Sequence, residues 1–294
     1  MKMKIKAPAK INLFLEVGAR RGDGFHDLRS VMQTVSLFDQ ITVRCDRSFR
    51  TRITVRSNSF FLPTDKRNIA FRAAELFRER FLSGDYDIAV SLEKHIPVCA
   101  GLGGGSADAA GVLYALNRMF PGKAKTEDLY ALAASLGSDV PFCLKKGTAL
   151  ANGRGEKLTS LPPLPPCRIV IAIENERVST AAAYAALDAL EHREEETVLA
   201  ESRYLALSRG LKTGDLSAVA ANLYNSFEES VLPSAPGAKR IREEMLEAGA
   251  LAALLSGSGA AVFALSSDRD AHRIADKLKK PGRRVFVCSP FEEI

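Results

Sequence analysis

A run of glycines at residues 98–108, Val-Cys-Ala-Gly-Leu-Gly-Gly-Gly-Ser-Ala-Asp, constrains this chain more than any other segment. The residues after it have helical spacing, with Leu113, Leu116 and Phe120 on one face and Ser106 as the expected N-cap. Glycines let a backbone approach a ligand closely, and a helix N-terminus offers free N–H groups and a positive dipole. The run therefore predicts a phosphate-binding loop, although a glycine-rich turn without a ligand would have the same sequence.

The run matches neither of the common phosphate-binding signatures. A Walker loop ends in Gly-Lys-Ser or Gly-Lys-Thr, and no lysine follows these glycines. A Gly-x-Gly-x-x-Gly register that starts at Gly101 meets Ser106, and one that starts at Gly103 meets Asp108. A phosphate site here thus belongs to another class of loop.

Four further segments carry distinctive residues along the chain. Pro-Ala-Lys-Ile-Asn-Leu at residues 8–13 precedes Arg-Gly-Asp-Gly-Phe-His at residues 21–26. Leu-Gly-Ser-Asp-Val-Pro-Phe occupies residues 136–142. Near the C-terminus, Ser-Gly-Ser-Gly at residues 256–259 joins two apolar strands.

Together with the glycine run, these segments resemble the GHMP kinase family of small-molecule phosphotransferases over nearly the whole chain. The resemblance implies an α+β fold with an N-terminal domain like ribosomal protein S5, a ferredoxin-like C-terminal domain and the active site between them. A proline-rich stretch after residue 160 marks the expected boundary, with an ATP-binding domain at residues 1–160 and a second domain at residues 161–294. The chain departs from the family pattern at Ala260 and Ala261, where Pro and Thr are usual, and at Phe25, where Tyr is common.

The family resemblance and the chemistry of phosphoryl transfer predict Asp139 as the general base for the acceptor hydroxyl, with Lys10 orienting its carboxylate. Pro141 disfavours helix for its predecessor, so Asp139 is expected in a turn. Lys10 alternates with Asn12 and shares one face of a strand start with it. From the residues alone, Asp139 is equally an ordinary turn residue and Lys10 a surface lysine.

The glycine run is expected to bind ATP together with Mg²⁺. The residues assigned to the nucleotide are Lys94, Pro97, Gly101, Leu102, Gly103, Gly104, Gly105 and Ser106. The Ser106 hydroxyl is the expected Mg²⁺ ligand, direct or through water, because Mg²⁺ takes few protein ligands and keeps several waters. Two plainer explanations stay open, an exposed strand-end lysine for Lys94 and a simple hairpin turn for residues 256–259.

For the acceptor, the resemblance implies methylerythritol linked to cytidine diphosphate. It places the cytidine against Phe25 and His26, with Tyr184 as a second ring and with hydrogen bonds from Thr180 and Asn12. A pyrimidine suits such a site because it has a flat face for stacking and an edge with donors and acceptors. The other histidines, His95, His192 and His272, have no metal-ligand spacing.

The net charge of +6 and the pI near 9.1 suit an anionic ligand or nucleic acid. The basic residues are scattered, however, without the aromatic interleaving of a single-strand surface. We therefore expect a small-molecule substrate and no nucleic acid partner. We also expect a cytoplasmic protein with no membrane partner, present as a monomer or weak homodimer. The five cysteines, an odd number, are expected to be buried free thiols.

Two alternatives stay open. One is a GHMP kinase that acts on homoserine, mevalonate or a sugar, which would not need the pair Phe25 and His26. The other is an RNA-binding protein, because the implied N-terminal fold also occurs in a ribosomal protein.

Periodicity and capping residues predict the elements. Strands are expected at residues 5–6, 11–17, 30–36, 39–44, 52–56, 88–94, 169–173, 251–255, 260–265 and 284–288. Helices are expected from Ser106 onward, at residues 69–82 with Asn68 as N-cap, at residues 127–136 with Thr126 as N-cap, and at residues 180–190.

Overall fold

The structure, a computed structural model, describes residues 1–176, 178–190 and 194–292. The chain forms two compact units, each built from three separate stretches. Unit 1 comprises Met1–Ala9, Leu37–Val98 and Gly103–Lys146, and unit 2 comprises Lys10–Ser36, Cys99–Leu102 and Gly147–Ile294. The expected division after residue 160 stays a prediction.

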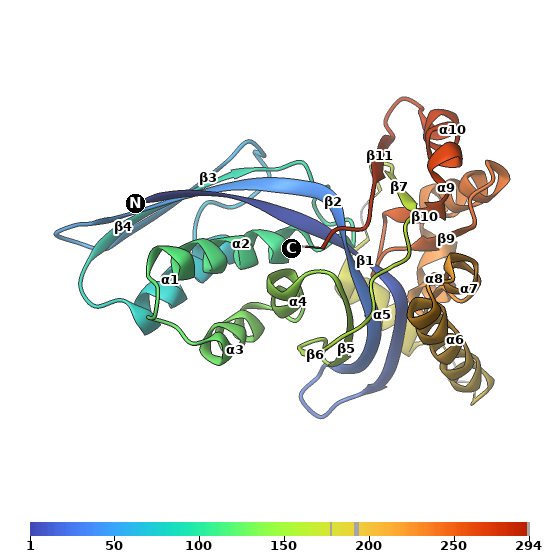
Figure 1. Ribbon diagram of the computed structural model, residues 1–294, viewed down its shortest axis with the longest axis horizontal. Helices are drawn as coiled ribbons and strands as arrows, with labels where there is room; N and C mark the ends of the chain where they lie inside the picture. The colour runs from blue at the N-terminus through green and yellow to red at the C-terminus, as the bar shows by residue number, and fades with distance from the viewer. Residues whose placement is uncertain (177, 191–193, 293–294) are drawn as a thin grey trace. The chain divides into compact units, whose positions relative to one another are not determined.

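Unit 1 combines strands with a group of helices. Its strand order is β3-β4-β2-β1, where β3 runs parallel to β4 and β4 antiparallel to β2. The strands are β1 (Lys2–Arg20), β2 (His26–Arg47), β3 (Arg52–Ser57) and β4 (Tyr86–Glu93). The helices are α1 (Ile69–Phe81), α2 (Gly104–Met119), α3 (Thr126–Leu136) and α4 (Val140–Lys145). They pack on one another and lie on one side of the strands (Figure 1).

Unit 2 contains the other halves of β1 and β2 and a second sheet. In the first sheet its strand order is β8-β1-β2-β5-β6, and the second sheet is antiparallel with the order β11-β7-β10-β9. The strands are β5 (Thr148–Gly153), β6 (Lys157–Ser160), β7 (Arg168–Ile173), β8 (Tyr224–Asn225), β9 (Ala252–Leu255), β10 (Val262–Ser266) and β11 (Arg284–Cys288). The helices are α5 (Thr180–Asp188), α6 (Glu194–Thr213), α7 (Leu216–Ala221), α8 (Phe227–Val231), the 3₁₀ helix η1 (Leu232–Ser234), α9 (Pro236–Glu247) and α10 (Asp268–Leu278).

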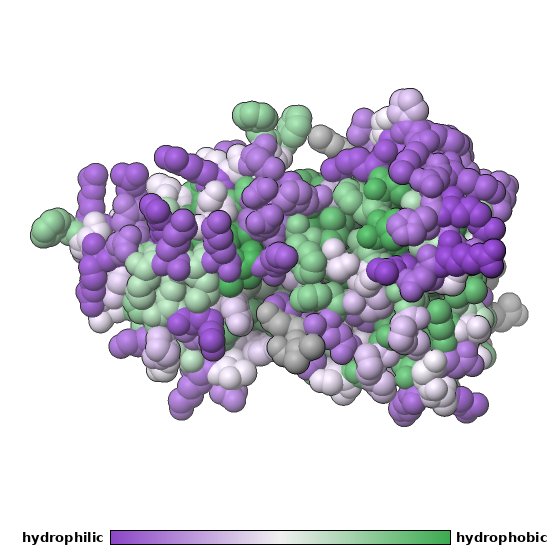
Figure 2. Space-filling model, turned by 45° about the horizontal axis from the view of Figure 1, so that its top comes forward, coloured by the Kyte–Doolittle hydropathy of each residue, from purple (hydrophilic) through white to green (hydrophobic). Residues whose placement is uncertain are grey.

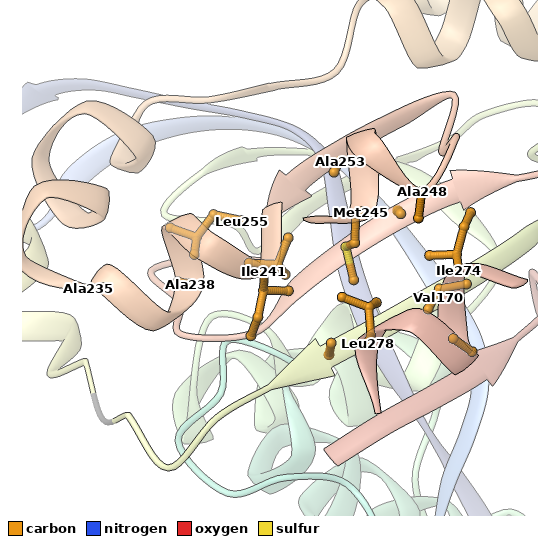
Figure 3. Packing of buried hydrophobic residues seen from close by; sticks show 14 of the residues in the cluster. Val170, Ala235, Ala238, Ile241, Met245, Ala248, Ala253, Leu255, Ile274 and Leu278 are labelled. Atoms are coloured by element: carbon orange, nitrogen blue, oxygen red, sulfur yellow. The ribbon is translucent and has the colours of Figure 1, made fainter. Parts of the chain in front are cut away.

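Two amphipathic helices cover the second sheet of unit 2. Ile241 and Met245 of α9 and Ile274 and Leu278 of α10 point into a core shared with Val170 of β7 (Figure 3). All five side chains are fully buried. Burial of such side chains stabilises a fold by about 1.5–3 kcal/mol each. This core holds β9 and β10, the two strands on either side of the Ser256–Gly259 loop.

The N-terminal strands are longer than the sequence indicated. The expected pairs of short strands at residues 5–6 and 11–17, and at residues 30–36 and 39–44, are each one continuous strand, β1 and β2. Residues 7–15 of β1 are buried without alternation, although they include Pro8, Lys10 and Asn12. Period-2 reasoning fails in this segment because both faces of the strand are covered.

Most other elements agree with the expectations, with two local differences in α3 and α4. Asn68 caps α1 as expected, accepting from the Ala70 N–H at 2.9 Å. The expected Thr126 cap of α3 is wrong, because Thr126 is already helical and Lys125 precedes it. Helix α4 was not anticipated, since Pro141 lies in its first turn, where its missing N–H costs no intrahelical bond.

The surface is mixed in character. Hydrophilic side chains are spread over the face in Figure 2, with hydrophobic side chains visible between them. Arg52 and Arg56 are exposed on β3. The expectation of buried thiols is wrong for Cys99, which is exposed, and Cys167 is half-buried.

Candidate active site

In unit 2, three buried polar side chains of β1 and β2 are linked in a row by hydrogen bonds, and this row is called the polar chain below. The Lys10 ammonium donates to Asn12 Oδ1 at 2.7 Å, and Asn12 Nδ2 donates to Ser30 Oγ at 2.8 Å. Lys10 is 5% exposed and Asn12 1%. The two residues share a face as expected, but in the middle of a strand and not at its start. Burying an ammonium is costly unless it is hydrogen-bonded, so this arrangement disfavours the simple surface-lysine explanation.

The Ser256–Gly259 loop lies directly against this polar chain. A Cβ added at Gly257 would be 3.3 Å from Lys10 Nζ and 3.5 Å from Asn12 Oδ1. The buried Asn225 side chain fixes the loop, because its Nδ2 donates to the carbonyls of Leu255 and Gly257, each at 2.8 Å. The loop is thus held by more than its own turn geometry.

The first part of the glycine run meets the same loop. Ser256 Oγ donates to the Gly101 carbonyl at 3.0 Å, and the Ala261 N–H donates to the Ala100 carbonyl at 3.1 Å. Gly101 has φ +76°, and a Cβ there would lie 1.9 Å from the Ser256 carbonyl oxygen. The packing of two loops therefore requires glycine at position 101. From the sequence alone, the same glycine is expected for a different reason, the close approach of a phosphate. Leu102, which is buried, accepts from the Lys10 N–H at 3.0 Å.

The second part of the glycine run belongs to unit 1 and begins α2. Gly103 is the N-cap with φ +68°, a left-handed conformation that favours glycine, and its carbonyl accepts from the Ala107 N–H at 2.9 Å. The expected Ser106 cap is wrong: the left-handed Gly103 starts the helix earlier and leaves Ser106 in the first turn. The N–H groups of Gly104, Gly105 and Ser106 have no intrahelical acceptor, as in any first helical turn. This end of α2 can bind an anion.

Lys94 is not an exposed strand-end lysine. Its side chain is 6% exposed and forms ion pairs with Asp39 and with Asp108, the latter at 2.6 Å. It also donates to the Gly104 carbonyl at 3.3 Å. Burial raises the pKa of Asp108 to about 7, a rise that the Lys94 ammonium opposes and the Asp39 carboxylate adds to. The buried Pro97 follows three residues later.

Asp139 lies in the turn between α3 and α4, as expected. It is half-buried, with φ −83° and ψ −13°, directly before α4 and its Pro141. Its carboxylate does not cap α4. Asp139 belongs to unit 1 and Lys10 to unit 2. Their expected pairing stays a prediction.

Of the residues expected to bind the acceptor substrate, His26 and Tyr184 contact each other directly in unit 2. The His26 ring stacks on the Tyr184 ring with centroids 4.9 Å apart, and Tyr184 packs edge-on against Phe227. Phe25 is 51% exposed, with the Arg154 guanidinium 4.8 Å from its ring centroid. The Thr180 hydroxyl lies 3.1 Å from Ser258 Oγ.

Asp188, which sequence reasoning missed, completes this group. Its Oδ1 lies 2.8 Å from His26 Nε2. Thr180, Tyr184 and Asp188 follow one another at intervals of four residues on α5 and thus share a helix face. That spacing was visible in the sequence and could have revealed Asp188. Asp39 and Asp108 had no comparable signal, because their partner Lys94 is distant in the sequence.

One cavity of unit 2 lies apart from the expected site residues. A cavity of about 640 Å³ in unit 2 is lined by α6, α7, α9 and β9, and none of the expected site residues lines it. In residues 1–176, 178–190 and 194–292, no three His, Cys, Asp or Glu side chains are grouped as a metal site. His192 lies outside the described residues. None of the helices described has the length and apolar composition of a membrane span.

Comparison with known families defines the class of protein. Residues 68–147 match the GHMP kinases N terminal domain, and residues 207–284 match the GHMP kinases C terminal domain. The chain belongs to the GHMP kinase family, a family of small-molecule kinases that use ATP. This confirms both the family and the α+β fold class expected from the sequence.

Full-length relatives narrow the similarity within the family. A protein of Lachnoclostridium phytofermentans named 4-diphosphocytidyl-2-C-methyl-D-erythritol kinase is 39% identical over 99% of this chain and 98% of its own. One of Exiguobacterium sibiricum with the same name is 41% identical over 98% of this chain and 97% of its own. A crystal structure of 4-(cytidine 5'-diphospho)-2C-methyl-D-erythritol kinase matches with a TM-score of 0.77 and 34% identity, covering 98% of both chains.

A homoserine kinase from Cytophaga hutchinsonii has a TM-score of 0.82 at 24% identity, covering 98% of this chain and 95% of that one. At that identity the match shows the fold alone. Kinases that act on different acceptor substrates therefore share this fold. The full-length sequence relatives, and not the fold, distinguish between these substrates.

Proposed function

We propose that this chain catalyses the ATP-dependent phosphorylation of the 2-hydroxyl of 4-diphosphocytidyl-2-C-methyl-D-erythritol, a step of the methylerythritol phosphate route to isoprenoid precursors. The single observation that carries the proposal is full-length identity of about two residues in five with relatives named for that kinase. The group of Phe25, His26 and Tyr184 supports it, because an exposed aromatic ring and a stacked imidazole suit a pyrimidine.

In this proposal Asp139 accepts the proton of the acceptor hydroxyl as that oxygen attacks the γ-phosphorus of ATP, and ADP leaves. Lys10 orients the carboxylate and keeps it ionised. The polar chain from Lys10 through Asn12 to Ser30 supports this role, since it fixes the direction of the ammonium. Asn12 and Thr180 supply hydrogen bonds to the acceptor.

The nucleotide phosphates are proposed to bind the N–H groups at the start of α2, at Gly103, Gly104, Gly105 and Ser106. Gly101, Leu102 and Pro97 support the loop around them, and Lys94 acts through its contact with Gly104. The Ser106 hydroxyl fits Mg²⁺ as one oxygen ligand, because it lies in the first turn and is not needed as the helix cap. Bound there, Mg²⁺ would screen the charge of the transferring phosphoryl group.

The remaining expectations are part of the same proposal. The chain divides functionally after residue 160, acts in the cytoplasm on a small molecule as a monomer or weak homodimer, and has no nucleic acid or membrane partner. RNA affinity that falls steeply with salt, in a protein that turns over no ATP, would favour the RNA-binding alternative.

The decisive experiment is transfer of labelled γ-phosphate from ATP to the cytidine-linked methylerythritol, with homoserine, mevalonate and sugars as control acceptors. We expect transfer to the cytidine compound alone. A thermal-shift screen adds an independent test, because selective stabilisation by CDP follows from binding to the folded state. Transfer to homoserine or mevalonate at a comparable rate would contradict the proposed acceptor.

Asp139→Asn tests the base. A positioned general base is worth roughly 10²-fold or more, so we expect less than about one-hundredth of the turnover with CDP binding retained. Asp128→Asn is the matched control, an exposed carboxylate of α3 in the same unit. An Asp139→Asn enzyme that keeps more than about a tenth of the turnover would remove Asp139 from this role.

A further inference from the structure

Two residues of helix α5 hold the imidazole ring of His26. The Tyr184 ring stacks on it with centroids 4.9 Å apart and an interplanar angle of 24°, which fixes the plane of the imidazole. Asp188 Oδ1 lies 2.8 Å from Nε2, which fixes the rotation of the ring within that plane. The His26 side chain is only 7% exposed, whereas that of Asp188 is 41% exposed. The imidazole thus has one orientation, set by residues one helical turn apart.

The contact with Asp188 also determines which nitrogen of His26 carries a hydrogen. An ionised carboxylate only accepts hydrogen bonds, so the Nε2 atom that faces it is the one that is protonated. In the neutral ring, Nδ1 then has a lone pair and no hydrogen. No described residue is hydrogen-bonded to Nδ1, and this atom is not among the buried atoms of the described chain that lack a partner. His26 therefore presents an acceptor, and not a donor, to a ligand beside it.

The neighbouring Phe25 offers a ligand its ring but no backbone hydrogen bond. Its N–H donates to Asp23 Oδ1 at 3.2 Å, and its carbonyl accepts from the Arg21 N–H at 2.6 Å. The ring itself is 51% exposed and open to stacking. Of the side chains of Phe25 and His26, only the imidazole can hydrogen-bond to the edge of a base that stacks on Phe25.

The two pyrimidines of nucleoside diphosphates differ where such an acceptor would meet them. Cytosine carries an amino group, a donor, at the ring position where uracil carries a carbonyl oxygen, an acceptor. A bare Nδ1 accepts from the amino group of cytosine but faces the lone pairs of the uracil oxygen. Two acceptors left opposite each other away from water weaken binding roughly 10- to 100-fold.

We propose that Asp188 makes the acceptor site selective for cytosine over uracil, because it holds His26 in the tautomer with a bare Nδ1. Asp188 is a positioning residue, since it acts through His26 and does not touch the base. No covalent bond forms or breaks. This inference rests on the proposed function, in which the cytidine lies against Phe25 and His26, and it names the residue that sets the choice of base.

Calorimetric titration with CDP and with UDP tests the selectivity. We expect the wild type to bind CDP roughly 10- to 100-fold more tightly than UDP, and Asp188→Ala to reduce this ratio to less than about 3-fold, because its His26 ring can take either tautomer. Asp276→Ala is the matched control, an exposed aspartate of α10 in the same unit, and should keep the wild-type ratio. A ratio in Asp188→Ala equal to that of the wild type would overturn the inference.

NMR of protein labelled with ¹⁵N-histidine reads the tautomer directly at pH 8, with His26→Asn to identify the His26 signals. We expect a protonated Nε2 and a bare Nδ1 in the wild type, and a mixture of the two tautomers in Asp188→Ala. A variant that merely disturbed the fold would also shift the signals of His95 and His272. Asp188→Glu, which keeps the carboxylate at an exposed helix end, should restore both the tautomer and the preference for CDP. A wild-type His26 that carries its proton on Nδ1 would overturn the inference.

Steady-state kinetics separates base selection from phosphoryl transfer. Asp188→Ala should raise KM for the cytidine-linked acceptor about 10-fold and leave kcat within about 2-fold, because one hydrogen bond to the base is lost and the reacting groups are untouched. A fall in kcat at unchanged KM would contradict the proposed role. If the wild type binds neither CDP nor UDP, the proposed function itself fails, which is a different result from equal binding of both.

Discussion

Each unit places one cation between two carboxylates, but the acids respond in opposite ways. Lys94 of unit 1 lies between Asp39 and Asp108, and burial raises the pKa of Asp108. Arg283 of unit 2 lies between Glu174 at 2.7 Å and Glu244 at 2.5 Å, and hydrogen bonds from its guanidinium lower the pKa of both glutamates.

Solvent access to the acids and the number of cations beside them explain the difference, because Arg240 also pairs with Glu174 at 3.1 Å and Lys280 with Glu244 at 2.7 Å. The Glu174 and Glu244 side chains are each 25% exposed, whereas the cation Arg283 is only 2% exposed. Water therefore solvates the negative charges in unit 2, and the planar guanidinium supplies several donors at once. In unit 1 the acids have no such access, and the ammonium cannot satisfy every oxygen. A single cation shared by two buried acids thus does not offset the effect of burial on the pKa of Asp108.

The largest effect expected from this comparison is that of Lys94→Met. Removing the one cation leaves two buried carboxylates facing each other, which costs about 3–5 kcal/mol of unfolding free energy at pH 8. The loss should be smaller at pH 6, where a carboxyl can protonate. Urea denaturation at both pH values measures it, and a loss below about 1 kcal/mol at pH 8 would contradict the proposed burial cost.

The pH dependence of stability should change next most strongly. Asp108 has a folded pKa near 7, above its unfolded value near 4, so the folded state binds more protons between these values and stability falls as pH rises from 4 to 7. At 1.36 kcal/mol per pKa unit the fall is at most about 4 kcal/mol. Asp108→Asn should abolish this component, which urea midpoints at pH 5 and pH 8 would detect. If the Asp108→Asn variant and the wild type differed in stability by the same amount at pH 5 and at pH 8, Asp108 would not be the source of this pH dependence.

Arg283→Met should have a smaller effect than Lys94→Met, about 1–3 kcal/mol at pH 7, because the glutamates left behind stay partly solvated. Both glutamates have folded pKa values below their unfolded values near 4.5. The contribution of Arg283 is thus present above pH 4.5 and is lost as pH falls through the folded values. Thermal unfolding at pH 7 and pH 3 tests this. A loss as large as that of Lys94→Met would show that solvent access is not the deciding factor.

The smallest effect serves as the baseline for both clusters. Asp276 of α10 and Lys279, which directly follows the helix, form a pair at 2.7 Å with side chains 69% and 70% exposed. Lys279→Ala should leave the unfolding free energy unchanged within the error of the measurement. The same urea titration measures it, with an expected decline in any effect as salt is raised.

A feature of the fold or of the site can be predicted from the sequence when its physical cause lies within a few neighbouring residues. Asn68 capping α1 and the strands on either side of Ser256–Gly259 were predicted, because capping and periodicity act over a few residues. The N-cap of α2 was missed by three residues, because a left-handed Gly103 and not Ser106 precedes the helix. Helix α4 was missed because a proline in a first turn and a proline after a turn look the same in sequence.

The site residues show the same limit. The pair Lys10 and Asn12 was recognisable from strand alternation. The reason for glycine at position 101 was not, because Ser256 is 155 residues away in the sequence. Asp39 joins Lys94 across 55 residues, and no local pattern records such a contact. The resemblance to the GHMP kinase family identified the motifs. The contacts that hold these motifs in place could be recognised only in the structure.

The interleaving of the two units has a consequence for synthesis on the ribosome. Every residue of unit 1 has been added once Lys146 is made, so that unit has all its parts with about half of the chain still to come. Unit 2 begins at Lys10 but needs segments made last, which at 5–20 residues per second arrive about 7 to 30 s later. During that interval residues 10–36 and 99–102 lack the segments that they pack against in unit 2, and unpaired strands of this kind are prone to aggregate.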